Sequence, residues 1–192
     1  MARLIFITHP EVVIDPAVPV PDWPLSPTGR ARMERFAGAE LVRGLTAIHA
    51  SAERKARDGA EILARATGLA VGIDPELGEN DRSSTGYVAP PEFWDIVRAF
   101  FAEPEVSVRG WERALDAQRR IVGAVERIAR GDPPGDIAVV AHGGVGALLL
   151  AHLTGARIGN GFGQPHPGGG CYLMIYRDTL ALEGDWRVLE DA

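Results

Sequence analysis

With 192 residues, of which 46% are hydrophobic and 24% charged, the chain has the composition of a folded domain and not of a disordered segment. The formal net charge of −6 argues against broad contact with nucleic acid, and no apolar run approaches the roughly 20 residues that span a bilayer. The single cysteine, Cys171, excludes an internal disulfide framework and a multi-cysteine metal site. We therefore expect one cytoplasmic domain over residues 1–192, with no cofactor, no metal site and no membrane contact.

The first half of the chain predicts strands that alternate with helices. Ser26 is a predicted N-cap with Pro27 at the first helical position, and Ser51 is a predicted cap for the following helix. The proline-rich residues 10–27 predict a loop. We expect strands over 4–7, 47–50 and 71–73, and helices over 27–44 and 52–66.

The second half continues the alternation after a long predicted loop over 76–90. Loops of that length in compact domains are usually functional or disordered. We expect helices over 91–102, 111–130 and 143–153, and strands over 137–141, 171–176 and 186–189. The pattern predicts a three-layer α/β/α sandwich with a mostly parallel central sheet.

Polar side chains follow three of the predicted strands. His9 comes after the first strand, Ser51 to Arg54 after the second, and His142 after the strand over 137–141. Ligands in such sheets bind at the carboxyl ends of the strands, so these groups converge on one rim. Glu79 is available from the long loop. His49 and His152 lie within a strand and a helix, and we interpret both as structural.

The order of these motifs resembles the histidine phosphatase (phosphoglycerate mutase-like) superfamily over nearly the whole chain. That family has Arg-His-Gly, Leu-Ser/Thr-x-x-Gly, Ser-Ser-x-x-Arg-Arg-Ala with Ala-Glu-Ile, Leu-x-Glu and Ser-His-Gly-Gly, in this order. The corresponding segments here are Thr8-His9-Pro10, Leu25-Ser26-Pro27-Thr28-Gly29, Ala50-Ser51-Ala52-Glu53-Arg54-Lys55-Ala56 with Ala60-Glu61-Ile62, Leu77-Gly78-Glu79, and Ala141-His142-Gly143-Gly144.

The resemblance implies that His9 is a nucleophile that accepts a phosphoryl group. It also implies that Arg54 and His142 hold the phosphate, and that Glu79 protonates the leaving oxygen. These roles suit the residues, because catalysis of phosphoryl transfer is mostly positioning and electrostatic stabilisation. Gly143 lets the following helix N-terminus approach an anion closely. The implied activity is metal-independent hydrolysis of a phosphomonoester.

The first motif departs from the family pattern, because Thr8 stands where the family has Arg and Pro10 where it has Gly. Thr8 supplies a neutral hydrogen bond but no bidentate charged contact. Loss of one such donor typically costs about 10²–10³ in rate. The pocket is then weakened, retuned to another ligand, or supplied with another cation. Among the candidate cations Lys55, Arg57 and Arg82, we favour Arg82, since it shares a loop with Glu79 and helical spacing turns Lys55 away.

Three other functions remain as alternatives. A weak or inactive relative would bind a phosphorylated or anionic ligand without turnover, and the Thr8 and Pro10 departures motivate this hypothesis. A phosphoglycerate-type mutase is disfavoured by the short chain. A nucleotide-binding module is disfavoured because no Gly-x-Gly-x-x-Gly or Walker-type sequence occurs. The sequence identifies neither the substrate nor the oligomeric state.

Overall fold

The computed structural model describes residues 1–131 and 133–192. A six-stranded sheet lies at its centre, in the order β3-β2-β4-β1-β5-β6. β1 pairs in parallel with β4, β4 with β2, and β2 with β3, whereas β5 pairs antiparallel with β1 and β6 pairs antiparallel with β5. The strands are β1 (Arg3–Thr8), β2 (Leu45–Ala50), β3 (Val71–Ile73), β4 (Asp136–Ala141), β5 (Cys171–Tyr176) and β6 (Arg187–Val188).

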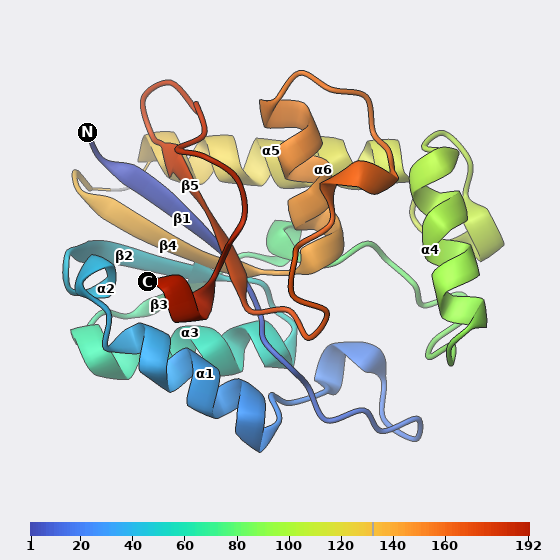
Figure 1. Cartoon of the computed structure of the whole chain (residues 1–192), viewed down its shortest axis with the longest axis horizontal. Coiled ribbons are helices and arrows are strands. Elements are labelled where there is room, and N and C mark those ends of the chain that lie inside the picture. Colours follow the sequence, from blue (N-terminus) through green and yellow to red (C-terminus); the bar gives the residue numbers. More distant parts are fainter. Residues whose placement is uncertain (132) are drawn as a thin grey trace.

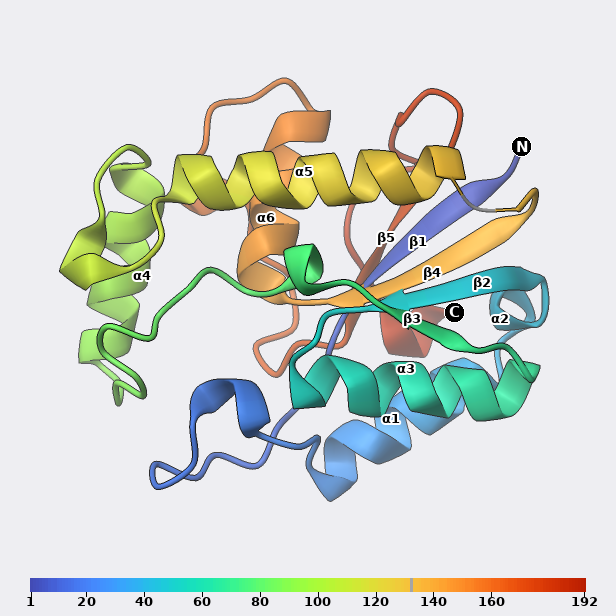
Figure 2. The ribbon, with the colours of Figure 1, turned by 180° about the vertical axis from the view of Figure 1, so that it is seen from behind.

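Helices cover both faces of the sheet (Figure 1). One face packs against α1 and α3, and the other against α5 and α6, while α4 lies beside the sheet (Figures 1 and 2). The predicted three-layer, mostly parallel α/β sandwich is confirmed. The helices are α1 (Pro27–Ala37), α2 (Glu40–Arg43), α3 (Arg54–Thr67), α4 (Glu92–Ala102), α5 (Ala114–Gly131) and α6 (Gly143–Leu153).

Alternation of side chains along the central strand β1 divides the core into two clusters. Leu4 and Phe6 join the cluster beneath α5 and α6, and Ile5 and Ile7 join the cluster beneath α1 and α3. All four are fully buried, as expected for a central strand that is covered on both faces. The carboxyl ends of β1, β2 and β4 therefore form one rigid edge. Among the described helices, none is long and apolar enough to cross a membrane.

Two predicted helix starts have different outcomes. Ser26 caps α1 as predicted, with its hydroxyl accepting from the Gly29 N–H at 3.0 Å. Ser51 does not cap α3, because that helix begins at Arg54 and Glu53 occupies its N-cap position. The predicted helix over 27–44 was also wrong in its extent. It breaks at Gly38, whose cost within a helix favours a turn before the short α2.

Candidate active site

His9 directly follows β1 at the carboxyl edge of the sheet. Its backbone N–H donates to the Ala141 carbonyl at 3.0 Å, and its ring Nδ1 lies 2.9 Å from the Pro10 carbonyl oxygen. A carbonyl only accepts hydrogen bonds, so Nδ1 carries the proton and Nε2 keeps a free lone pair. Burial lowers the pKa of His9 to about 3, and the neighbouring His142 and Lys55 add to this effect. The ring is thus neutral at physiological pH.

His142 follows β4 and is fully buried at the start of α6. Its ring centroid lies 5.2 Å from that of His9, and its Nε2 is 2.8 Å from the Ser51 hydroxyl. Burial lowers the pKa of His142, although Glu53 opposes the shift with a carboxylate oxygen 3.4 Å from Nε2. The buried Nδ1 has no hydrogen-bond partner among the described residues. Ser51 therefore contacts the buried imidazole of His142 and does not cap a helix.

Lys55 reaches the site from the first turn of α3, in contrast to the sequence expectation that it turns away. Its side chain is 5% exposed, and Nζ donates to the Glu53 carboxylate and to the Val20 carbonyl, the latter at 2.9 Å. Arg54 is exposed and does not line the cavity that contains His9. The cation that α3 contributes to this cavity is therefore Lys55 and not the expected Arg54. Arg57, the other candidate on α3, is also exposed.

Glu79 lies against the N-terminus of α6. Its two carboxylate oxygens accept from the Gly144 and Val145 N–H groups at 3.0 and 2.9 Å, and one lies 3.3 Å from the Arg82 guanidinium. Burial alone would raise the pKa of Glu79, but Arg82 and His142 more than compensate and hold the pKa below its usual value. A Cβ at Gly144 would lie 2.6 Å from Oε1 of Glu79, so a glycine permits this close approach. The carboxylate occupies a position that also suits an anionic ligand.

Arg82 lies in the same loop as Glu79, and an aromatic pair holds its guanidinium. The guanidinium carbon is 5.3 Å from the Phe93 ring centroid and 5.0 Å from that of Trp111, within cation–π range. Nε donates to the Asn80 side chain at 3.1 Å. Arg82 is therefore a preorganised cation that lines the cavity, and its role as the replacement for the missing arginine stays a prediction.

Thr8 and Gly143 do not line this cavity. The Thr8 hydroxyl is buried, donates to the Gln164 side chain at 2.6 Å and accepts from the Cys171 N–H at 2.9 Å. It thus connects β1 to β5 and to the loop before it. Gly143 faces the same glutamine, since a Cβ there would lie 2.6 Å from Gln164 Nε2. The expected contacts of Thr8 and Gly143 with phosphate stay predictions, and neither residue lines the cavity.

The remaining predicted residues share one cavity of about 620 Å³. Its charged floor pairs Glu53 with Lys55 and Glu79 with Arg82, and the imidazoles of His9 and His142 complete it. Although burial raises the pKa of Glu53, His142 and Lys55 lower it to about 2, so this carboxylate is ionised. Sequence reasoning missed Glu53 as a site residue. Its position two residues after Ser51 and two residues before Lys55 was the available signal.

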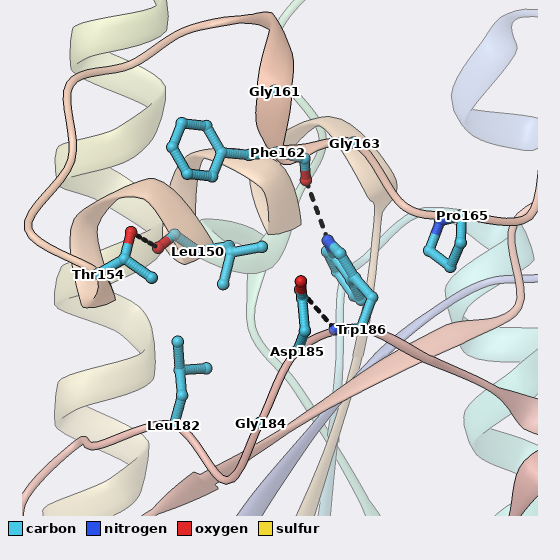
Figure 3. A pocket seen from close by; sticks show the side chains of 10 residues that line it. All are labelled: Leu150, Thr154, Gly161, Phe162, Gly163, Pro165, Leu182, Gly184, Asp185 and Trp186. Atoms are coloured by element: carbon cyan, nitrogen blue, oxygen red, sulfur yellow. Dashed lines mark hydrogen bonds between the residues drawn. The ribbon is translucent and has the colours of Figure 1, made fainter.

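A second cavity, of about 420 Å³, lies at the opposite end of α6 (Figure 3). Leu150 and Thr154 of α6 border it, and Trp186 donates from its indole Nε1 to the Phe162 carbonyl at 3.0 Å. Asp185 is the ionisable side chain among its ten lining residues, and it accepts from the Trp186 N–H at 2.7 Å. This cavity lacks the imidazole and cation pairs of the first. Among the described residues, no group of three or more His, Cys, Asp or Glu could hold a metal ion.

Comparison with known proteins identifies the family and the fold of this chain. Residues 11–182 match the histidine phosphatase superfamily (branch 1), and the match begins two residues after His9. A search of curated proteins found no match. Solved structures with the same fold include a mycobacterial glucosyl-3-phosphoglycerate phosphatase with inorganic phosphate, which is 22% identical over 99% of both chains with a TM-score of 0.79.

Two further solved structures are similar. The same mycobacterial phosphatase with VO3 is 24% identical, with 97% of this chain and 96% of that chain covered and a TM-score of 0.72. Bacillus stearothermophilus YhfR is 22% identical, with 96% of this chain and 98% of that chain covered and a TM-score of 0.78. At these identities the likeness establishes the fold.

Proposed function

Because this chain belongs to branch 1 of the histidine phosphatase superfamily, we propose that it hydrolyses a phosphomonoester, without a metal ion, through a phosphohistidine at His9. The observation that carries the proposal is the Nδ1 contact of His9 with the Pro10 carbonyl, 2.9 Å long. It keeps a neutral ring with its Nε2 lone pair available at the wall of a cavity that two cations share. Thr8 and Pro10 leave this tautomer intact.

The first step transfers the phosphoryl group to the protein. Nε2 of His9 attacks phosphorus, the bond from phosphorus to the leaving oxygen breaks, and that oxygen takes its electron pair and a proton from Glu79. Lys55 and Arg82 stabilise the charge that spreads over the equatorial oxygens. In this chain they take the place of the arginine that precedes the first histidine in the family pattern. His142, held by Ser51, contacts the same group.

The second step returns His9 to its neutral state. Water attacks the phosphohistidine, Glu79 accepts one of its protons, and the bond between phosphorus and Nε2 breaks to release inorganic phosphate. Glu79 is ionised in the ligand-free site, so the first step needs a proton that arrives with the substrate. A phosphomonoester monoanion, whose second pKa lies near 6, supplies it. The phosphoryl oxygens then replace the Glu79 carboxylate as acceptors of the N–H groups at the N-terminus of α6.

A second candidate is an anion-binding protein without turnover. It is favoured by the pairing of both cavity cations with carboxylates, Lys55 with Glu53 and Arg82 with Glu79. These pairs make the floor electrically neutral before a ligand arrives. An incoming dianion must then compete with two resident carboxylates, which weakens phosphate binding and slows transfer.

The test measures phosphate release from an aryl phosphate in the presence of a chelator. We expect native protein and a His152→Asn control to turn over, because His152 is exposed and lies outside the cavity. We expect His9→Asn to lose activity by at least 10³-fold, the scale on which removal of a covalent nucleophile acts. Anion binding without phosphate release by native protein on a panel of phosphomonoesters would replace hydrolysis with the binding function.

A further inference from the structure

We propose that the substrate carries an uncharged apolar or aromatic leaving group, held by a hydrophobic wall of the cavity that contains the charged floor. This inference rests on the proposed function, because it concerns the alcohol from which the phosphoryl group departs. The segment after β1 supplies most of this apolar wall, which comprises Val12, Pro16, Ala17, Val18, Pro19, Val20, Pro21 and Trp23, together with Tyr87 from the long loop.

The apolar wall and the charged floor belong to one cavity, so a ligand whose phosphoryl group reaches His9 extends along the wall. The cavity volume of about 620 Å³ lies in the range of sites for small organic ligands and exceeds what a phosphoryl group alone fills. The apolar area next to the reacting group is therefore available to the leaving group.

The part of this wall that follows β1 offers few free hydrogen-bond donors. Pro16, Pro19 and Pro21 have no N–H, and the N–H groups of Ala17 and Val18 both donate to Asp15, at 2.9 and 3.0 Å. The polar end of Trp23 is also occupied, because its Nε1 donates to the carbonyls of Asp15 and Val18 at 2.9 and 3.1 Å. A sugar-like leaving group would lose water from its hydroxyls without gaining these donors as partners.

The wall is formed before any ligand binds. Lys55 ties it to the floor through the Val20 carbonyl, and Val13 N–H donates to the Pro24 carbonyl at 3.0 Å. The rings of Trp23 and Tyr87 meet edge to face, with centroids 5.4 Å apart. Prolines restrict the backbone between these ties. An apolar ligand therefore buries surface here without first ordering the segment.

Charge at the rim favours an uncharged leaving group. Asp81 lines the cavity, is exposed, and holds its carboxylate through the Ser83 N–H at 2.8 Å. Hydrogen bonds from Ser83 lower the pKa of Asp81. A leaving group with its own carboxylate or second phosphate would meet this negative charge as well as the apolar wall.

The experiment compares two phosphonates that share a head group and are not hydrolysed, methylphosphonate and benzylphosphonate. Binding is measured calorimetrically with native protein and with His9→Asn. We expect benzylphosphonate to bind roughly tenfold more tightly to both, as partial burial of one aromatic ring predicts. Affinities equal within twofold would overturn the inference, whether or not the protein hydrolyses phosphomonoesters.

A matched pair of variants locates the effect. Val18→Asn places an amide on the wall, whereas Val13→Asn changes a 44% exposed side chain of the same segment that does not line the cavity. We expect Val18→Asn to lose most of the preference for the benzyl compound and Val13→Asn to keep it. Retention of the preference by both variants would place the aromatic ring elsewhere and contradict this assignment.

Turnover separates this inference from the proposed function. Benzyl phosphate and glucose 6-phosphate both release primary alcohols, so a difference in kcat/KM between them reports on the leaving-group contacts. We expect benzyl phosphate to be favoured roughly tenfold. Hydrolysis of both compounds at equal kcat/KM would refute the inference and support the proposed hydrolysis. A preference for binding the benzyl compound without hydrolysis of either would support the apolar wall as a binding surface and refute the proposed hydrolysis.

Discussion

The two ends of α6 border two cavities of comparable size and different chemistry. At its N-terminus, Glu79 accepts from the Gly144 and Val145 N–H groups beside two imidazoles with lowered pKa values. At its C-terminus, the cavity in Figure 3 is built around Leu150 and Trp186. The difference shows that the position of a cavity relative to the sheet determines which side chains line it. The N-terminal end coincides with the carboxyl edge of parallel strands, where polar groups from β1, β2 and β4 converge.

The largest effect that sharpens this comparison is expected for Glu79→Gln. Loss of the proton donor should lower kcat by about 10²–10⁴-fold for an alkyl phosphate, and by less for an aryl phosphate, whose leaving oxygen needs no proton. Steady-state kinetics on both substrates tests this. Glu76→Gln is the control, since Glu76 is an exposed carboxylate of the same loop. Equal losses on both substrates would assign Glu79 a purely structural role.

The next effect tests which residue of α3 serves the site. Lys55→Ala should lower kcat/KM by about 10²–10³-fold, the typical cost of one lost donor to a developing anion. Arg54→Ala should leave it unchanged, because Arg54 is exposed outside the cavity. The opposite ranking in a parallel assay of the two variants would restore the assignment that the sequence motif suggested.

Substitutions at two glycines of α6 are expected to have different effects, one on activity and the other on stability. A Cβ at Gly146 would lie 2.8 Å from the Trp186 ring and 2.9 Å from the Phe6 ring. Gly146→Ala should therefore cost about 1–3 kcal/mol of unfolding free energy with kcat unchanged. Gly144→Ala should displace the flexible Glu79 carboxylate, lowering kcat with little change in stability. Chemical denaturation and kinetics on both variants measure this, and the same response from both would contradict the assignment of Gly144 to the site and of Gly146 to packing.

The smallest effect concerns acid stability. Burial lowers the pKa of His9 from its usual value of 6.5 to about 3 in the folded chain, so below pH 6.5 the unfolded chain binds a proton that the folded chain does not bind. Stability should fall by about 1–2 kcal/mol from this group between pH 7.5 and pH 5. His9→Asn should have a flatter profile in denaturant titrations at the two pH values. The same dependence of stability on pH in His9→Asn and native protein would mean that burial does not lower the pKa of His9.

The sheet and the convergence of its strand ends followed from the sequence, because buried apolar runs such as Leu4 to Ile7 leave few alternatives. The side of α3 that faces the site did not follow. Residues 52 and 53 were expected to be helical, but the helix begins at Arg54. The sequence motif assigned the site-facing position to Arg54, and because neighbouring helical residues point about 100° apart, a site that contains Lys55 leaves Arg54 turned away.

Other features of the site depend on contacts between distant segments. The pairing of Lys55 with the Val20 carbonyl and the position of Ser51 under His142 arise only when the strand ends meet. Arg82 was favoured from its place beside Glu79, but its support by Phe93 and Trp111 is a tertiary feature. Local sequence patterns do not encode such contacts.

The most direct test of the central claim is to trap the covalent intermediate on His9. Native protein mixed with an aryl phosphate is quenched in alkali at successive times, since phosphohistidine is labile in acid, and the peptide that contains His9 is analysed by mass spectrometry. We predict one added phosphoryl group on this peptide, formed and lost at rates consistent with turnover, and none in His9→Asn. Continued phosphate release with the peptide unmodified at every time would contradict the account.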